Sequence, residues 1–486
     1  MLTRADLIFK NFKSDHTYIN QVSKKIFMVE AEEYSDRPVP QDARLGFMKP
    51  AMVWAGFTYA YICIFIGSTI MGGLGAPLGY YAIFLGQAFL FIYAGLIGHR
   101  AYKFGLNFPM MCKCSFGRVG YIIPMTIIAG LVTGWFAFQA WLAADLMVGL
   151  YGGESFLAGT GSGVLPGILG TTGLWAGIFA IIFGCIAVYG IRTMAWMGRA
   201  AVVCVTALAI WMIYSLSTIV ATETGGNPWS SAPSGEPMTF ALGITASIGT
   251  FVVSATMTGD FSRWTKSVKQ AWGINAVAFP IANHLMLFIG AFYTAIAGQL
   301  DFFFGLSMVA LGAPIMIIQW VSNGTTCDGC LYNASQGFRN LLLIGKPEKK
   351  LSFSWKKITI IVMICGTAVA ASNVLNDIVP WLLLISTVAP LIGGILIGHF
   401  WIVARNNTQE EVLLASERKV NWPAIVGILS GTAVAAYMIT YVPDLPPILG
   451  GLIGGCAVYP LIAYAAGYAS RGKLTAKGIG AERSGT

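Results

Sequence analysis

The thirty Lys and Arg residues of this 486-residue chain all lie in alternate gaps between long apolar runs. The gaps that contain them are 4–49, 100–118, 192–199, 263–269, 339–357, 405–419 and 471–483. The intervening connections, near 75–79, 151–171, 223–238, 298–306, 373–378 and 442–446, contain neither residue. Because short connections rich in Lys and Arg stay on the cytoplasmic side of a membrane, this alternation predicts an even number of crossings with both chain ends in the cytoplasm.

The composition excludes an ordinary soluble protein. Hydrophobic residues make up 56% of the chain and charged residues 10%, whereas a soluble domain has about 25% charged residues. The net charge of +9 is spread over the basic gaps, as membrane orientation requires, so we expect membrane lipids and not nucleic acid as partners. Zinc-protease, nucleotide-loop and serine-hydrolase motifs are missing from the sequence, so we expect neither an enzyme nor a cofactor.

Apolar runs long enough to cross a hydrocarbon core of about 30 Å predict an all-α polytopic protein with twelve transmembrane helices in the cell (inner) membrane. The runs lie near 50–74, 80–98, 120–150, 173–191, 200–222, 239–259, 271–297, 307–333, 357–374, 378–403, 421–441 and 446–469. The predicted divisions of the chain are a cytoplasmic segment 1–48, a transport core 49–405, a cytoplasmic loop 406–420, a final helix pair 421–469 and a cytoplasmic tail 470–486.

Two of these runs contain residues that interrupt a helix within the membrane. The first has Gly56, Tyr59 and 67–69, and the sixth has Gly243, Gly249 and several hydroxyl residues. Because interruptions at corresponding spans mark inverted repeats with a site between them, we expect broken helices 1 and 6. The predicted ten-helix core then consists of two repeats of five, about 49–222 and 239–405, followed by two extra helices.

Hydroxyl residues form a cluster in the eighth run. Ser322, Thr325 and Thr326 lie at i, i+3 and i+4, so a helix places their oxygens on one face. With carbonyls released where the first helix breaks near Gly56 and Tyr59, these oxygens can coordinate a hard monovalent cation. Hydroxyls in membrane helices also bond their own i−4 carbonyls, and the spacing leaves both interpretations open.

The third run contains the elements of a pocket for a flat ring. Trp135 and Gln139 are four residues apart and share a helix face, and an indole with an amide can hold a planar heterocycle, although the same pair can serve helix packing. Asp328 is an acidic residue within an apolar run and is therefore a functional candidate. Cys327 and Cys330 match a C-x-x-C spacing, which predicts no metal site without a second ligand pair.

Motifs along the chain resemble those of the nucleobase–cation symporter family, and specifically its cytosine and purine permease branch. The matching stretches are 38–46, 56–59, 67–69, 115–117, 134–136, 249–251, 259–261, 325–328 and 331–332. They are collinear from about 38 to 405. The resemblance implies a leucine-transporter-like fold with ten core helices in two inverted repeats and two further helices.

The resemblance also implies a substrate site. A planar substrate would stack between Trp135 and Phe251, with Gln139 as the amide of the third span, a position closer to the hydantoin and purine pattern than to the cytosine pattern. Further residues of the implied site are Ala60, Thr250, Val253, Cys327 and Asp328. Many relatives carry an asparagine in place of Cys327, and this departure leaves the identity of the substrate open.

In sodium-coupled members, the cation is held by groups that match the carbonyls of Gly56, Tyr59 and Ser322 and the hydroxyls of Thr325 and Thr326. The implied function is import of a planar nucleobase, cytosine or a purine, by cation symport, with Na+ as the expected coupling ion and alternating access as the mechanism. The alternatives are a symporter of hydantoin, allantoin or another small heterocycle, a proton-coupled nucleobase permease, and a passive channel or facilitator.

Overall fold

The computed structural model describes residues 34, 37–151, 154–155, 159–160, 171–189, 200–207, 210–211, 214–215, 218, 227–298, 312–342, 354–372 and 378–480. Several parts of the predicted organisation lie wholly or partly outside the described residues. They include 1–33 and 481–486 near the chain ends, the basic connections 192–199 and 343–353, most of the connections 151–171 and 298–306, residues 223–226 and 373–377 of two others, part of the fifth run near 200–222, and the start of the eighth run at 307–311.

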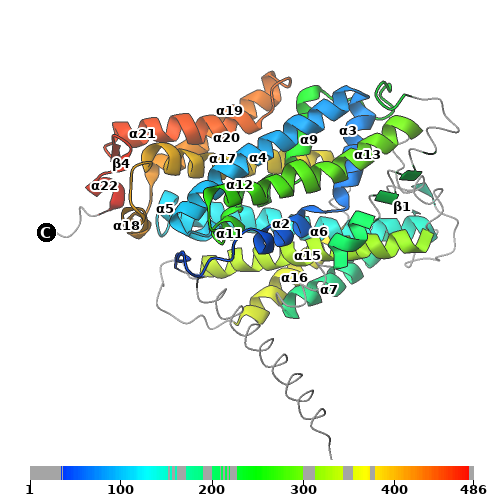
Figure 1. Ribbon diagram of the computed structural model, residues 1–486, viewed down its shortest axis with the longest axis horizontal. Helices are drawn as coiled ribbons and strands as arrows, with labels where there is room; N and C mark the ends of the chain where they lie inside the picture. The colour runs from blue at the N-terminus through cyan, green and yellow to red at the C-terminus, as the bar shows by residue number, and fades with distance from the viewer. Residues whose placement is uncertain are drawn as a thin grey trace, which may run out of the picture.

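The described part of the chain is mostly helical (Figure 1). Its first half contains α2 (Met48–Thr58), α3 (Ile62–Leu74), α4 (Leu78–Phe104), α5 (Phe108–Phe116), α6 (Ile122–Tyr151), β1 (Glu154–Ser155), β2 (Gly159–Thr160) and α7 (Thr172–Tyr189), and 200–207 are also helical. Then follow α9 (Phe240–Gly249), α10 (Val252–Thr256), α11 (Gly259–Ser262), α12 (Val268–Ala276), η3 (Val277–Asn283), α13 (His284–Ala297), α15 (Gly312–Leu342) and α16 (Trp355–Ala371). The last part contains α17 (Ile378–Gly398), η4 (His399–Val403), α18 (Gln409–Leu414), η5 (Ala415–Glu417), α19 (Trp422–Tyr441), α20 (Ile448–Ile453), η6 (Gly454–Val458), α21 (Tyr459–Ala465), β3 (Ala469–Ser470), β4 (Lys473–Leu474) and α22 (Ala476–Ile479).

Two small antiparallel ribbons add to the helical fold that the sequence predicts. β1 pairs with β2, and β3 pairs with β4 through the register Ala469 to Leu474. In the second ribbon the turn residues Arg471 and Gly472 both have positive φ, 50° and 76°, as a tight two-residue hairpin requires. Strands of two residues have no detectable period, so the apolar pattern could not predict them.

Six described helical segments are long and apolar enough to cross a membrane, and the bent pair α2 and α3 makes a seventh. The six are Leu78–Phe104, Ile122–Asp145, Val268–Ile296, Ile378–Val403, Trp422–Tyr441 and Ile448–Ala465. Each coincides with one of the predicted runs. Two shorter apolar helices, Thr172–Val188 and Phe240–Gly249, match parts of the fourth and sixth runs.

The helices of the core pack in two groups. The first group contains α2, α3, α4 and the segment from α9 to α13, and the second contains α6, α7, α15 and α16. The most extensive contacts of the first group join α3 to α13 and α4 to α9, and those of the second join α6 to α15 and α6 to α7. α17 contacts both groups and also packs on α19 and α20.

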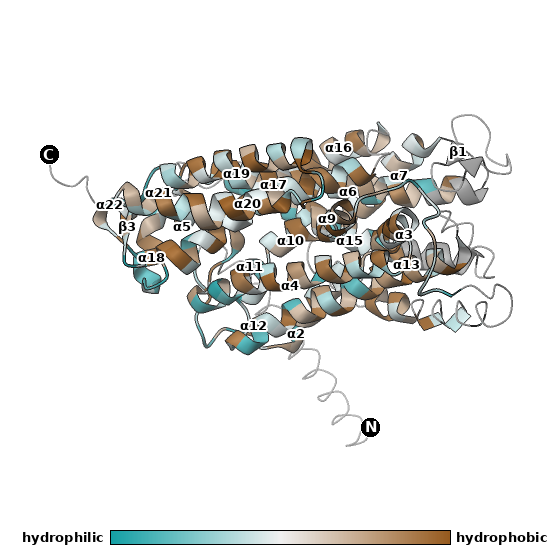
Figure 2. Cartoon of the chain, turned by 90° about the horizontal axis from the view of Figure 1, so that it is seen from above, coloured by the Kyte–Doolittle hydropathy of each residue, from teal (hydrophilic) through white to brown (hydrophobic). Residues whose placement is uncertain are grey.

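Three of the segments that contain basic residues, 100–118, 405–419 and the described part of the C-terminal tail, meet at one end of the molecule. Arg418 donates from its guanidinium to the carbonyls of Cys114, Ser115 and Gly478, at 2.9, 3.2 and 2.6 Å. At the opposite end, two connections without basic residues meet, where Ala76 N–H donates to the Ser231 carbonyl at 3.0 Å. Figures 1 and 2 show α18 and α22 at the first end and β1 at the other.

Glycines allow α3 and α13 to pack with their backbones in contact. A Cβ atom on Gly290 would collide with the Ile64 carbonyl and lie 2.9 Å from the Ser68 nitrogen, and one on Gly67 would collide with the Leu287 carbonyl. Small residues at helix interfaces are the means by which membrane helices approach closely. The broken first span is therefore fixed along its second half to the seventh.

We expect Gly290→Ala to destabilise the protein by about 1–3 kcal/mol, because the added methyl meets backbone atoms that cannot move aside independently. The measurement is thermal unfolding of the purified protein in detergent. The control is Gly130→Ala on α6, where nothing lies within 4 Å of the added Cβ and alanine improves helix propensity by up to about 1 kcal/mol. Equal unfolding temperatures for the two variants would contradict the proposed close contact.

Candidate functional site

The first predicted span is broken in the middle. α2 ends at Thr58, α3 begins at Ile62, and the two helices are bent by 56° relative to each other. Tyr59 is the C-cap residue of α2, with φ −73° and ψ 50°. Ala60, a predicted site residue, lies in the break and is fully buried. Backbone polar groups released at such a depth need partners within the protein.

Ser322 of α15 supplies a partner on both sides of this break. Its hydroxyl donates to the Tyr59 carbonyl at 3.0 Å and accepts from the Tyr61 N–H at 3.2 Å. A hydroxyl has one donor and two acceptor positions, so it can make both bonds at once. Ser322 is itself 0% exposed. The second helix group therefore stabilises the broken form of a helix in the first group.

The other two predicted hydroxyls lie one turn further along α15. Thr325 Oγ1 donates to the Ser322 carbonyl at 2.8 Å, and Thr326 Oγ1 donates to the same carbonyl at 3.3 Å. These are the i−3 and i−4 bonds that the spacing left open as an alternative. They bring three oxygens together within one helical turn, and each hydroxyl keeps acceptor lone pairs.

The predicted ligand set is chemically suited to a hard monovalent cation. Gly56 lies in the last turn of α2, where carbonyls have no partner within the helix. Its carbonyl and those of Tyr59 and Ser322, with the Thr325 and Thr326 hydroxyls, are neutral oxygens, the donors that hard cations prefer. Within the described ranges, three or more His, Cys, Asp or Glu residues nowhere gather into a site for a metal ion.

The sixth predicted span is also interrupted. α9 ends at Gly249 and α10 begins at Val252, which leaves Thr250 and Phe251 between them. Phe251 has φ −140° and ψ 12°, outside the helical region. Val253, another predicted site residue, lies in the first turn of α10 and is 1% exposed.

A buried amide pair that the sequence analysis missed holds this second interruption. Asn283 Nδ2 donates to the Thr250 hydroxyl and to Gln87 Oε1, both at 2.9 Å, and Gln87 Nε2 donates to the Ser247 carbonyl at 3.2 Å. Asn283 ends the π-helical turn η3, and Gln87 lies in the middle of α4. Each is a single amide in an apolar run, which is the only signal that the sequence offered.

Trp135 of α6 contacts a second tryptophan that the sequence did not single out. The rings of Trp135 and Trp381 are 6.4 Å apart at an interplanar angle of 81°. Trp381 lies in the first turn of α17, and a Cβ on Gly134 would overlap its ring. Glycine next to Trp135 therefore allows α17 to approach the third span at this level.

Side chains link the four helices that contain the predicted residues. Cys327 Sγ on α15 donates to the Phe136 carbonyl on α6 at 3.3 Å. Phe57 of α2 packs against Gly329 of α15, and its ring lies 5.8 Å from that of Phe251 at an angle of 70°. α10 also contacts α6. The predicted residues on α2, α6, α10 and α15 therefore belong to one continuous buried region.

Trp135 and Phe251 make their ring contacts with other aromatic residues and not with each other. Trp135 meets Phe138 and Trp381, and Phe251 meets Phe57. Both are almost fully buried, at 6% and 4% exposure. A flat ligand can be held between the Trp135 and Phe251 rings only if the two rings do not stack on each other.

Several buried polar atoms in this region have no hydrogen-bond partner. They are Gln139 Oε1 on α6, Asp328 Oδ2 and both amide atoms of Asn323 on α15, and Trp381 Nε1 on α17. Gln139 and Asp328 are 1% and 2% exposed. Because an unsatisfied buried polar group costs about 1–3 kcal/mol, such atoms are rare in folded proteins and are expected where a ligand supplies the missing bonds.

Comparison with known proteins gives a family match over most of the chain. Residues 38–459 match the family described as permease for cytosine/purines, uracil, thiamine, allantoin. The cytosine permease of Escherichia coli strain K12 is 26% identical over 436 residues, which are 90% of this chain and 96% of that protein. The hydantoin permease of Microbacterium maritypicum is 26% identical over 385 residues, 72% of each protein.

Solved structures show the same fold. Mhp1 in an inward-facing conformation has a TM-score of 0.71 at 20% identity, covering 90% of this chain and 96% of Mhp1. Mhp1 in a closed conformation with bromovinylhydantoin bound has a TM-score of 0.69 at 20% identity, covering 90% and 98%. It is described as a nucleobase-cation-symport-1 family transporter.

We expect Ser322→Ala to loosen the break between α2 and α3. The variant removes the donor to the Tyr59 carbonyl and the acceptor of the Tyr61 N–H, at a cost of about 1–3 kcal/mol. The measurement is hydrogen exchange of peptides that cover 58–64, together with the unfolding temperature. Ser335→Ala is the matched control, because Ser335 is equally buried on α15 and bonds only to the Leu331 carbonyl of its own helix. Equal exchange in both variants would refute the bridging role of Ser322.

Proposed function

Because the chain belongs to the nucleobase–cation symporter family, with 38–459 matching its permeases for cytosine/purines, uracil, thiamine and allantoin, we propose that it imports a planar nucleobase by cation symport. The chain is a multi-pass membrane transporter. The proposed substrate is cytosine or a purine, and the proposed coupling ion is Na+. Relatives named for cytosine and for hydantoin support a small nitrogenous heterocycle as the substrate class.

The observation that carries the proposal is the Ser322 bridge. It joins the carbonyl end of α2 to the hydroxyl turn of α15, and these are helices of two different packing groups. A cation bound by Gly56, Tyr59, Ser322, Thr325 and Thr326 would reinforce that junction. Na+ is a hard cation without directional preference, so neutral oxygens from two helices suit it.

The proposed substrate pocket adjoins the cation site along α15. A flat ring would stack between Trp135 and Phe251. The unpartnered Gln139 Oε1 and Asp328 Oδ2 are acceptors, so they would bind N–H groups on the edge of the heterocycle. Ala60, Thr250, Val253 and Cys327 complete the proposed lining. Nucleobases and hydantoins have both the flat faces and the N–H groups that this set requires.

We propose that the chain crosses the inner membrane twelve times, with the core 49–405 built from inverted repeats at about 49–222 and 239–405. Segments 1–48 and 470–486 and the loop 406–420 would be cytoplasmic, and 421–469 would form the two extra helices. The two helix groups support the repeats, because each contains helices that lie five spans apart in the chain. The meeting of basic connections at one end supports the orientation.

Transport would follow from movement of one helix group against the other around this shared site. Cation binding would hold α2 against α15 and favour the arrangement that also completes the substrate pocket. The two ligands would then strengthen each other's binding by the same factor, since coupling free energies are reciprocal. A pathway open to both sides of the membrane at once would dissipate the cation gradient. The site must therefore open to the outside and to the cytoplasm in turn.

We expect Trp135→Ala to weaken nucleobase binding about 5- to 150-fold, because loss of a stacking ring costs about 1–3 kcal/mol per base. Binding is measured on purified protein with labelled cytosine, adenine, hypoxanthine, uracil, allantoin and hydantoin, with Na+ present. Trp422→Ala is the control, since Trp422 is 63% exposed on α19. Unchanged affinity of Trp135→Ala for every compound would reject the pocket.

We expect Thr326→Ala to raise the Na+ concentration for half-maximal substrate binding roughly tenfold or more, since loss of metal-site groups has effects of this size. Thr387→Ala is the matched control, because Thr387 makes the same type of bond, to the Leu383 carbonyl of α17. Sealed vesicles with a Na+ gradient should accumulate the substrate, and replacement of Na+ by choline at fixed pH should abolish accumulation.

Other results of the vesicle experiment identify the alternatives. Accumulation that persists in choline and follows a pH gradient would assign coupling to a proton, for which the buried Asp328 is the candidate carrier. Equilibration without accumulation under any gradient would indicate a facilitator.

A further inference from the structure

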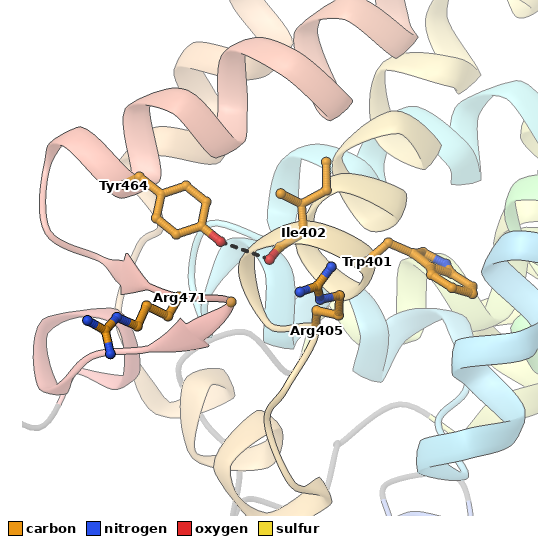
Figure 3. A pocket seen from close by; sticks show the side chains of 6 residues that line it. Trp401, Ile402, Arg405, Tyr464 and Arg471 are labelled. Carbon is orange, nitrogen blue, oxygen red and sulfur yellow. Dashed lines mark hydrogen bonds between the residues drawn. The ribbon is translucent and has the colours of Figure 1, made fainter.

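A cavity lies at the end of the molecule where the three basic segments meet, away from the proposed transport site. Its volume is about 470 Å³, and it lies between the end of η4, α21 and the turn of the C-terminal ribbon. The lining residues are Trp401, Ile402, Arg405, Tyr464, Arg471 and Gly472. Figure 3 shows Tyr464 bonded to the Ile402 carbonyl, a hydrogen bond of 3.0 Å.

The walls of this cavity are fixed by hydrogen bonds. Asn406 N–H donates to the Gly472 carbonyl at 2.9 Å, and Asn406 Nδ2 donates to the Arg471 carbonyl at 3.0 Å. Trp401 Nε1 donates to the Leu96 carbonyl of α4 at 3.0 Å. The C-terminal turn and the end of the tenth span are thus held together independently of any ligand.

The cavity carries an excess of positive charge. Arg405 and Arg471 line it and are exposed. Arg100 lies behind the Trp401 ring, with its guanidinium carbon 4.1 Å from the ring centre, and it is close enough to Arg405 for their charges to interact. Arg100 is only 6% exposed, and its Nε has no hydrogen-bond partner.

Among the residues that the structure describes, none of these arginines is in contact with a carboxylate. The neighbouring Glu411 is engaged in its own helix start, where it accepts from Thr408 N–H at 2.8 Å and Asn407 Nδ2 at 3.1 Å. Like charges close to a low-dielectric interior repel one another strongly and favour binding of an anion. The positive charge around the cavity is therefore not compensated by a carboxylate among the described residues.

The position of the cavity indicates what anion would occupy it. η4 and α21 end the segments Ile378–Val403 and Ile448–Ala465, which are apolar enough to cross a membrane. Tryptophan and tyrosine at the ends of such segments mark the level of the lipid headgroups. Basic pockets between helices on the cytoplasmic side suit the phosphates of anionic lipids.

We propose that the cavity between η4, α21 and the ribbon turn binds the phosphodiester headgroup of an anionic membrane lipid. Arg405 contacts the phosphate, and Arg100 adds long-range attraction through the Trp401 wall. Arg471 adds positive charge at the rim of the opening, where its side chain points away from Arg405 (Figure 3). The acyl chains extend along the apolar surface of α21, where Leu461 is 70% exposed. This site is independent of the proposed transport function.

The test uses full-length protein purified in detergent and freed of lipid. Binding of cardiolipin and phosphatidylglycerol, and of phosphatidylcholine as the zwitterionic comparison, is measured by native mass spectrometry. The double variant Arg405→Gln with Arg471→Gln should bind the anionic lipids roughly 30-fold more weakly, because each basic residue near an anionic headgroup contributes a factor of about five. The anionic lipids should also raise the unfolding temperature of the parent protein more than that of the variant.

The matched control is Lys356→Gln with Lys357→Gln, which removes two exposed charges at the start of α16 and should change lipid affinity less than twofold. An equal loss of anionic-lipid affinity in the two double variants would show that only the net charge of the protein matters, and it would overturn the proposed site. Equal affinity for phosphatidylcholine would also overturn it. Inorganic phosphate and glycerol phosphate serve as probes without acyl chains, and binding of either as tight as that of phosphatidylglycerol would exclude the lipid assignment.

Discussion

The structure depends on how the backbone is satisfied where the first span breaks. In a membrane interior, each unpaired N–H or C=O costs several kcal/mol, so a helix interrupted at Tyr59–Tyr61 persists only if another element supplies the missing bonds. The Ser322 hydroxyl does so on both sides of the interruption. The break is thus a property of two helices and not of one. Any movement that separates α15 from α2 must either replace those bonds or release the bend.

This dependence supports the proposed cation site at the junction. α15 belongs to the second packing group and the broken span to the first, and the second interruption, at Thr250 and Phe251, is held by Gln87 and Asn283 within the first group alone. The two breaks are therefore stabilised differently. The hydrogen bonds at the first break cross from one group to the other, whereas those of Gln87 and Asn283 do not, so the first break is where we propose that an ion acts on the relative position of the groups.

Six of the predicted spans, the bent first span and both interruptions are found among the described residues, because apolar length and mid-span polarity are local signals. The sequence placed the first break near Gly56 and Tyr59, and the structure has it between Thr58 and Ile62. The exact residue at which α2 ends depends on the tertiary bond to Ser322, which the local sequence does not reveal. Trp381 and the Gln87–Asn283 pair were missed for the same reason. Their roles arise from contacts with residues on other helices, and the local sequence pattern does not indicate which residues of different helices will meet.

The hydrogen-bonding groups of α15 and of the neighbouring α6 restrict which edge of a ligand can face them. The Cys327 thiol donates its only hydrogen to the Phe136 carbonyl, so in this structure it serves to join α15 to α6. The next residue, Asp328, keeps one oxygen without a partner, as does Gln139 on the facing helix. These two oxygens accept hydrogen bonds, so they bind a ligand edge with N–H donors and repel an edge that presents only carbonyl oxygens to them. Among flat heterocycles, this favours those with adjacent ring or exocyclic N–H groups, and a ligand that lacks them would need water or a protonated Asp328 to bind.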